Sequence, residues 1–218
     1  MSVAKVLKMI KDKEVKFVDL RFTDTKGKWQ HTAQTASTIN ENTFKEGIMF
    51  DGSSIAGWKN INESDMILMP DPNTAVIDPF TAQPQMILFC DVIEPSDGKP
   101  YELDPRSTGK KAEDYLKSSG IGEKCFFGPE PEFFVFDDVK WATNQEYTFF
   151  SIDSEEGAYN TGAEMEGGNM GHRPKDKGGY FPVPPVDSAT DIRAEMVSTM
   201  IEMGLDMEKH HHEAVSYT

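Results

Sequence analysis

The chain has 218 residues, of which 38% are hydrophobic, so it can bury the core of one large domain or two smaller ones. Its 22 basic and 37 acidic residues give a net charge of −15, which argues against binding to nucleic-acid backbones or anionic membranes. Two cysteines are too few for a disulfide scaffold, and neither a signal peptide nor a long apolar run is present. We therefore expect a cytoplasmic protein.

The first hundred residues predict a small mixed sheet crossed by one helix. Apolar residues at helical spacing favour a short amphipathic helix over residues 3–11. A second short helix is expected over residues 40–47, with Gly47 just past its end. Alternating or apolar runs predict strands over residues 15–22, 28–34, 64–69, 74–77 and 85–92. This layout is β-grasp-like, and we place the domain at residues 13–97.

A boundary between domains is expected at Glu94–Pro100, which is dense in turn-forming residues. A helix follows over residues 105–118 and opens on a proline. Its expected inner face consists of Ala112, Tyr115 and Leu116. We place a second domain at residues 105–218.

The second domain begins with few regular signals. Residues 137–180 predict long loops with a short strand near residues 147–152. The strongest helical pattern spans residues 187–204, where Asp187 or Ser188 is the expected cap. A last strand is expected over residues 205–213.

Two glutamates alternate with prolines in Gly128-Pro-Glu-Pro-Glu-Phe-Phe-Val-Phe-Asp-Asp138. The apolar residues 133–136 predict a strand, so Glu130 and Glu132 would lie on one face, roughly 7 Å apart. Two carboxylates this close repel each other unless a cation or a proton separates their charges. The residues alone leave two interpretations open, a divalent-metal site and a pair of solvated glutamates.

A second cluster is Glu208-Lys-His-His-His-Glu213. On a strand, His211 and Glu213 would share a face and Glu208 would lie on the other. Histidine and glutamate suit Mn²⁺, and carboxylates alone suit Mg²⁺. The run is also compatible with a solvated strand end or with the remnant of an affinity tag.

Two glycine-containing stretches are weaker signals. Phe50-Asp-Gly-Ser-Ser54, followed by Glu63-Ser-Asp65, is typical of a tight loop that presents an exposed carboxylate or simply makes a turn. In Lys177-Gly-Gly-Tyr-Phe-Pro-Val-Pro-Pro-Val-Asp187, the paired glycines allow close approach to a ligand, or the segment is a rigid connection. It is not a P-loop.

These stretches together resemble the motifs of bacterial, type I glutamine synthetase. The Asp51 loop, Glu130-Pro-Glu132, Gly167-Gly-Asn-Met-Gly-His-Arg173, Gly178–Asp187 and Glu208–Glu213 occur in that family's order, over about residues 3–213. The resemblance implies an α+β fold, with a β-grasp domain followed by the first part of an α/β catalytic domain.

The resemblance also implies an activity, ATP-dependent formation of glutamine from glutamate and ammonia through γ-glutamyl phosphate. It implies Mg²⁺ or Mn²⁺, two or more per site, which neutralise charge during phosphoryl transfer. It further implies a homo-oligomer, a dodecamer in the family, whose sites are shared between subunits. Neither nucleic acid nor membrane is an expected partner.

Carried over by motif, five residues match the metal, nucleotide and phosphoryl positions. Glu130, Glu132 and Glu213 resemble metal ligands, Glu208 a residue of the ATP site, and His211 one that faces the transferred phosphoryl group.

Three further residues match the family's ammonium site. Asp51 resembles the aspartate that helps bind ammonium and takes its proton in a neighbouring subunit's site, with Ser54 beside it. Tyr180 resembles a tyrosine near the same pocket.

The sequence departs from the family after Glu213, where it reads Ala214-Val-Ser-Tyr-Thr218 and the motifs of a longer chain are missing. We therefore expect a truncated chain with little activity alone, because a half-built site loses positioning and charge neutralisation. The alternatives are a non-catalytic assembly or interference partner of a full-length synthetase, an acidic metal-binding protein of unrelated fold, or a γ-glutamyl ligase for another amine.

Overall fold

The computed structural model describes residues 1–154, 156–157, 173–174 and 178–213. Of the predicted motif at Gly167–Arg173, only Arg173 lies within the described residues. The chain divides into two compact units, residues 1–127 and 128–218. Each unit is described by itself.

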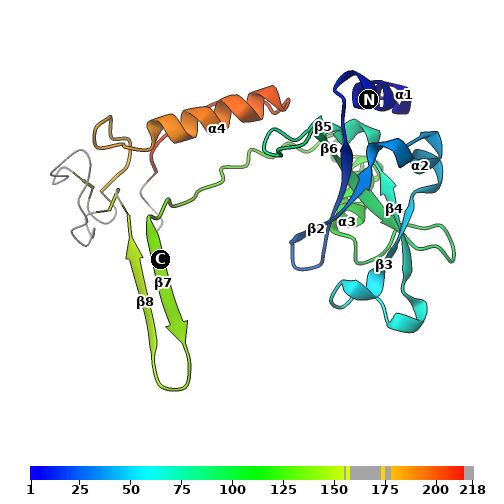
Figure 1. The fold of residues 1–218 in the computed structure, drawn as a ribbon, viewed down its shortest axis with the longest axis horizontal. Helices are drawn as coiled ribbons and strands as arrows, with labels where there is room; N and C mark the ends of the chain where they lie inside the picture. Colours follow the sequence, from blue (N-terminus) through cyan, green and yellow to red (C-terminus); the bar gives the residue numbers. More distant parts are fainter. Residues whose placement is uncertain (155, 158–172, 175–177, 214–218) are drawn as a thin grey trace. The chain divides into compact units, whose positions relative to one another are not determined.

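The first unit is built on a mixed sheet (Figure 1). Its strands are β1 (Phe17–Thr23), β2 (Trp29–Thr35), β3 (Ile48–Asp51), β4 (Asp65–Pro70), β5 (Val76–Ile77) and β6 (Gln85–Ile93). Their order is β2-β1-β6-β4-β3, with β5 also paired to β6. The β1–β6 pair is parallel and the other pairs are antiparallel. The predicted mixed sheet is confirmed, whereas β3 was not predicted.

Two short helices precede and cross this sheet, as predicted. The helix α1 (Val3–Asp12) begins after Ser2, whose hydroxyl accepts a hydrogen bond from the Lys5 amide, and it buries Val6 and Ile10. The helix α2 (Glu41–Glu46) is capped by Asn40 and ends at Gly47, where φ is +73°. Four short 3-10 turns complete the connections: η1 (Ala36–Thr38), η2 (Gly52–Ser54), η3 (Ile61–Glu63) and η4 (Pro72–Thr74).

Alternating strand residues form the core of the first unit. Leu20, Met66, Leu68, Met86 and Leu88 are fully buried. Cys90 is also buried, as predicted, and burial raises the pKa of its thiol. An aromatic group extends the core towards the end of β3 and comprises Phe22, Phe50, Trp58 and Tyr101.

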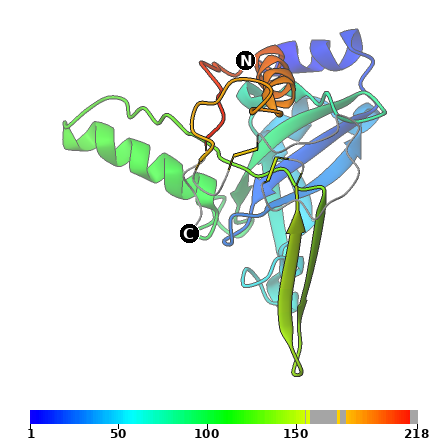
Figure 2. The ribbon, with the colours of Figure 1, turned by 90° about the vertical axis from the view of Figure 1, so that its left-hand side faces the viewer.

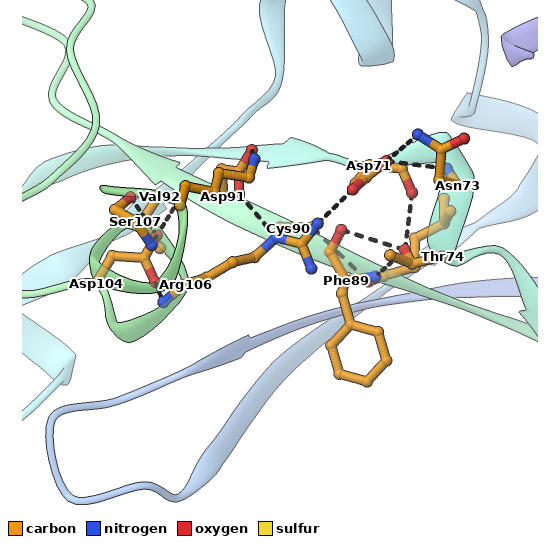
Figure 3. Close-up of polar contacts among 12 residues, drawn as sticks. Asp71, Asn73, Thr74, Phe89, Cys90, Asp91, Val92, Asp104, Arg106 and Ser107 are labelled. Atoms are coloured by element: carbon orange, nitrogen blue, oxygen red, sulfur yellow. Dashed lines mark hydrogen bonds and ion pairs between the residues drawn. The ribbon is translucent and has the colours of Figure 1, made fainter. Parts of the chain in front are cut away.

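The third helix, α3 (Pro105–Ser119), is attached to the sheet through its first turn (Figure 3). Asp104 is fully buried and accepts hydrogen bonds from the backbone amides of Arg106, Ser107 and, on β6, Val92. Arg106 forms ion pairs with Asp71 beside η4 and with Asp91 of β6.

The predicted inner face of α3 is wrong, because Ala112 and Tyr115 are exposed and Leu116 is only half-buried. In Figure 2 the helix runs away from the sheet beyond its first turn. The helix α3 is therefore held to the sheet by polar contacts at its N-terminus, and not by the apolar face that the spacing of its residues predicted.

The second unit contains a hairpin and a helix (Figure 2). The strands β7 (Asp138–Thr143) and β8 (Thr148–Asp153) pair antiparallel, and the helix is α4 (Thr190–Glu202). Strand β8 and the helix were predicted, and β7 was not. The N-cap residue of α4 is Ala189, so the predicted cap at Asp187 or Ser188 is wrong by one or two residues. The Asp187 carboxylate accepts hydrogen bonds from the Ala189 amide and the Thr190 hydroxyl.

Two predicted strands are absent from the described residues. Residues 133–136 and 205–213 are not part of any ladder, and no described strand pairs with them. A strand needs a hydrogen-bonding neighbour as well as suitable side chains, and residues 133–136 keep exposures of 40–51%. Within the described part of the chain, no helix is long and apolar enough to cross a membrane.

Candidate functional site

Asp51 is the last residue of β3, where it lies opposite Asp65 of β4. Its carboxylate accepts hydrogen bonds from the amide (2.8 Å) and the hydroxyl (2.6 Å) of Ser53. These bonds hold the pKa of Asp51 below its usual range, and the residue is exposed. The structure therefore presents an ionised carboxylate at the surface of the first unit.

The loop that begins at Asp51 is fixed to the core behind it. The Gly52 amide donates to the Ser64 carbonyl at 2.7 Å, and a Cβ atom on Gly52 would lie only 2.5 Å from the Met66 sulfur. Ile55 and Trp58 are buried, while Ser54 is exposed. Glycine is required here because the backbone packs directly on a buried side chain.

In the second unit, the segments around Tyr180 and His211 contact each other. The Phe181 amide donates to the His212 carbonyl at 3.2 Å, and the His212 Nδ1 lies 2.5 Å from the Gly179 carbonyl oxygen. The His211 ring lies 4.5 Å from the Phe181 ring and 5.8 Å from the Tyr180 ring. Tyr180 and His211, both predicted site residues, are therefore neighbours.

His211 also contacts a third predicted residue, because its Nε2 lies 3.4 Å from a carboxylate oxygen of Glu213. The two side chains are therefore neighbours, although the strand on which they were expected to share a face is absent from the described residues. Glu208 is exposed.

A neighbouring group consists of Glu156, Asp187 and His212, whose possible ligand atoms lie within 4.8 Å of one another. The His212 Nε2 is 3.5 Å from Glu156. Asp187 forms an ion pair with Arg193. Burial acts to raise the pKa of Asp187, but hydrogen bonds from Arg193 and Thr190 outweigh burial and keep the pKa below its usual range.

Sequence reasoning missed Glu156 and His212. His212 stands between two predicted site residues and has the opposite parity on an extended backbone, which is a usable signal for a supporting role. Glu156 follows β8 in an irregular stretch, where nothing in the sequence singles it out.

Glu130 and Glu132 lie on an exposed segment without regular structure rather than on a strand. Among the described residues, they do not form a group of three close metal-ligating side chains with Glu213. Asp51 and Ser54 belong to the first unit and the other predicted site residues to the second.

Comparisons with known proteins cover both units. The family model described as "Glutamine synthetase, beta-Grasp domain" matches residues 14–95, and "Glutamine synthetase, catalytic domain" matches residues 102–216. Curated glutamine synthetases from Azospirillum brasilense, Bradyrhizobium diazoefficiens and Escherichia coli K12 are 59%, 60% and 58% identical to this chain. Each alignment covers 99% of the chain and 46% of the relative.

A solved structure of Plasmodium falciparum glutamine synthetase has a similar fold. It matches with a TM-score of 0.83 at 23% identity, over 98% of this chain and 42% of that chain. As the alignments with the curated relatives show, the chain spans about half the length of the relatives it matches.

Proposed function

Because the chain belongs to the glutamine synthetase family, we propose that it acts in the ATP-dependent joining of glutamate and ammonia through γ-glutamyl phosphate. The observation that carries this proposal is the 58–60% identity to curated glutamine synthetases over 99% of the chain. We further propose domains at residues 13–97 and 105–218 and a cytoplasmic homo-oligomer with sites shared between subunits, as the resemblance implies.

Asp51, Ser54 and Tyr180 are the proposed ammonium-site residues. The exposed, ionised carboxylate of Asp51 supports this role, because a fixed negative charge attracts a small cation. The lowered pKa of Asp51 makes its carboxylate a weak base, which suits binding ammonium better than taking a proton from it.

His211 is proposed to face the transferred phosphoryl group and Glu208 to belong to the ATP site. The contacts of the His211 ring with Tyr180, Phe181 and Glu213 support a fixed orientation for that imidazole. A fixed donor needs no reorientation when charge develops on the phosphoryl oxygens.

Glu130, Glu132 and Glu213 are the proposed ligands of Mg²⁺ or Mn²⁺. Their oxygen atoms suit hard divalent cations, which would neutralise charge on the phosphoryl group when bound. Among the described residues, these three carboxylates do not form one close group.

Membership of the glutamine synthetase family excludes the alternative of an acidic metal-binding protein of unrelated fold. Nothing among the described residues favours a non-catalytic assembly partner over the proposed ligase.

A chimera tests the proposal. Residues 1–213 replace the matching part of the Azospirillum brasilense enzyme, and phosphate release from ATP is measured with and without glutamate and ammonium. We expect turnover that requires both substrates. An assembled chimera without such turnover would contradict the proposal. The 218-residue chain alone should show no turnover, because the proposed metal ligands do not form one site.

Matched substitutions in the chimera test the residues. Glu130→Gln and Glu132→Gln should each lower turnover by a factor of about 10 or more. Each should also raise the Mn²⁺ concentration needed for half-maximal turnover roughly 10–100-fold, because a metal contact is lost. Glu113 is an exposed glutamate on α3 that forms an ion pair with Lys117, so Glu113→Gln is the control and should change neither value.

A further inference from the structure

His212 separates two proposed site residues, His211 and Glu213, and its own side chain makes different contacts. Its Nδ1 lies 2.5 Å from the Gly179 carbonyl oxygen. A carbonyl oxygen only accepts, so this ring nitrogen carries the proton and donates. The backbone carbonyl of His212 accepts in turn from the Phe181 amide at 3.2 Å. Side chain and backbone of one residue therefore hold both ends of the Gly179–Phe181 segment.

The opposite edge of the imidazole faces Glu156, at 3.5 Å from Nε2 to Oε1. The same carboxylate oxygen accepts from the amide (3.2 Å) and the hydroxyl (3.0 Å) of Ser188, just before α4. The side chain of His212 is only 12% exposed. With both ring nitrogens protonated, the imidazolium donates to Gly179 and attracts the Glu156 carboxylate, and it then links three separate stretches of the chain.

The consequence of these links is the position of Tyr180. With Gly179 and Phe181 both held by His212, Tyr180 has little freedom to leave the His211 ring, whose centre is 5.8 Å away. Phe181 packs on His211, the residue proposed to face the phosphoryl group, with the two ring centres 4.5 Å apart. We propose that His212 is a positioning residue that fixes the ammonium-site tyrosine against the phosphoryl-site histidine; this inference rests on the proposed function.

A cation held by Glu156, Asp187 and His212 is the competing interpretation of the same group. Asp187 is already bound to the Arg193 guanidinium and the Thr190 hydroxyl. A metal ion there would sit beside a positive charge and would have to share the Asp187 oxygens with these donors. The contacts therefore favour a structural link over a metal centre.

Two substitutions of similar size distinguish the contact made by Nδ1 from the contact made by Nε2. In His212→Asn the amide nitrogen replaces Nδ1 and keeps the bond to Gly179, while in His212→Gln it replaces Nε2 and keeps only the contact with Glu156. His210→Gln, an exposed neighbour in the same histidine run, is the matched control.

The first readout uses the 218-residue chain without any catalysis. The His211 ring protons lie beside two aromatic rings, so their NMR shifts report the position of Tyr180 and Phe181. We expect wild-type shifts in His212→Asn and His210→Gln and shifts near random-coil values in His212→Gln. The amide shifts of the β7–β8 hairpin confirm that the second unit remains folded.

The second readout is the Michaelis constant for ammonium in the chimera. His212→Gln should raise it roughly 10–100-fold, the cost of misplacing a site group by about 1 Å, whereas His212→Asn should stay within about threefold of wild type. Wild-type shifts and Michaelis constant in His212→Gln, or equal losses in both variants, would overturn the inference. An inactive wild-type chimera would instead count against the proposed function, and the NMR comparison would still decide the role of His212.

Discussion

Replacing Gly52 by alanine tests whether the Asp51 loop depends on direct packing of backbone against the core. An ideal Cβ on residue 52 would lie 2.5 Å from the Met66 sulfur, 2.8 Å from its Cγ and 3.1 Å from the Ser64 carbonyl oxygen. Met66 is fully buried on β4, so its side chain cannot move aside into solvent. Either the core repacks around Met66 or the loop lifts and carries Asp51 with it.

The expected cost follows from these contacts. Overpacking of a well-packed site typically destabilises a protein by about 1–3 kcal/mol. Replacing glycine by alanine also reduces the freedom of the unfolded chain, which stabilises the folded state by about 0.4–1 kcal/mol. We expect Gly52→Ala to lower the free energy of unfolding of the first unit by about 1–2 kcal/mol. The assay is urea unfolding of the 218-residue chain, followed by tryptophan fluorescence, because Trp58 lies in that core.

The matched control is expected to raise the free energy of unfolding. Gly109 lies in the exposed interior of α3, and no atom lies within 4 Å of a Cβ placed there. Gly109→Ala should therefore stabilise the same unit by roughly 0.5–1 kcal/mol, the difference in helix propensity. If Gly52→Ala is as stable as wild type while Gly109→Ala is more stable, Met66 has room to move and the packing argument is refuted.

Three further predictions concern the cap of α3, the cysteines and an ion pair. Asp104→Ala should cost about 2–4 kcal/mol in urea unfolding, from a lost helix cap and an orphaned buried amide of β6, whereas exposed Asp114→Ala should stay within about 0.5 kcal/mol. Iodoacetamide at neutral pH should label Cys125 alone in the folded chain and Cys90 only after denaturation, as mass spectrometry would show, because burial raises the pKa of Cys90 and shields it. Since the pKa of Asp187 is lowered by folding, its ion pair stabilises the second unit above the unfolded pKa of about 3.9, and this contribution is lost as pH falls through the lower folded value. The difference in melting temperature between wild type and Asp187→Asn should accordingly shrink below about pH 4; a constant difference would contradict this assignment.

Features set by neighbouring residues were predictable from the sequence. The helix α1 follows from local apolar spacing and the cap at Ser2, and α2 follows from the cap at Asn40. Gly47 ends α2 because its positive φ suits glycine. Such signals need no knowledge of the rest of the fold.

Strands were less predictable because pairing is not local. Residues 133–136 carry ideal strand side chains, yet no described strand pairs with them. Conversely, β7 contains charged residues and was missed, but it pairs along its whole length with β8 across a short turn. The partner, rather than the side chains of the segment itself, decided each case.

The site residues show the same distinction. The family resemblance supplied the residue types, and alternation along an extended chain supplied the prediction that His211 and Glu213 lie close together; the two side chains contact each other at 3.4 Å. Neither source supplied the anchoring of those residues to the Gly179–Phe181 segment, because that depends on contacts between distant parts of the chain.

The residue between two site residues decides how they are held. Between His211 and Glu213 stands His212, which has a ring nitrogen and a carbonyl available to bind Gly179 and Phe181. Between Glu130 and Glu132 stands Pro131, which has a backbone carbonyl but no polar side-chain atom, so it can supply only the backbone half of such a link. We therefore expect the two glutamates to depend on their own contacts, or on a bound cation, for their position. Alternation places two carboxylates on one face, but a metal site also needs the intervening backbone to be anchored.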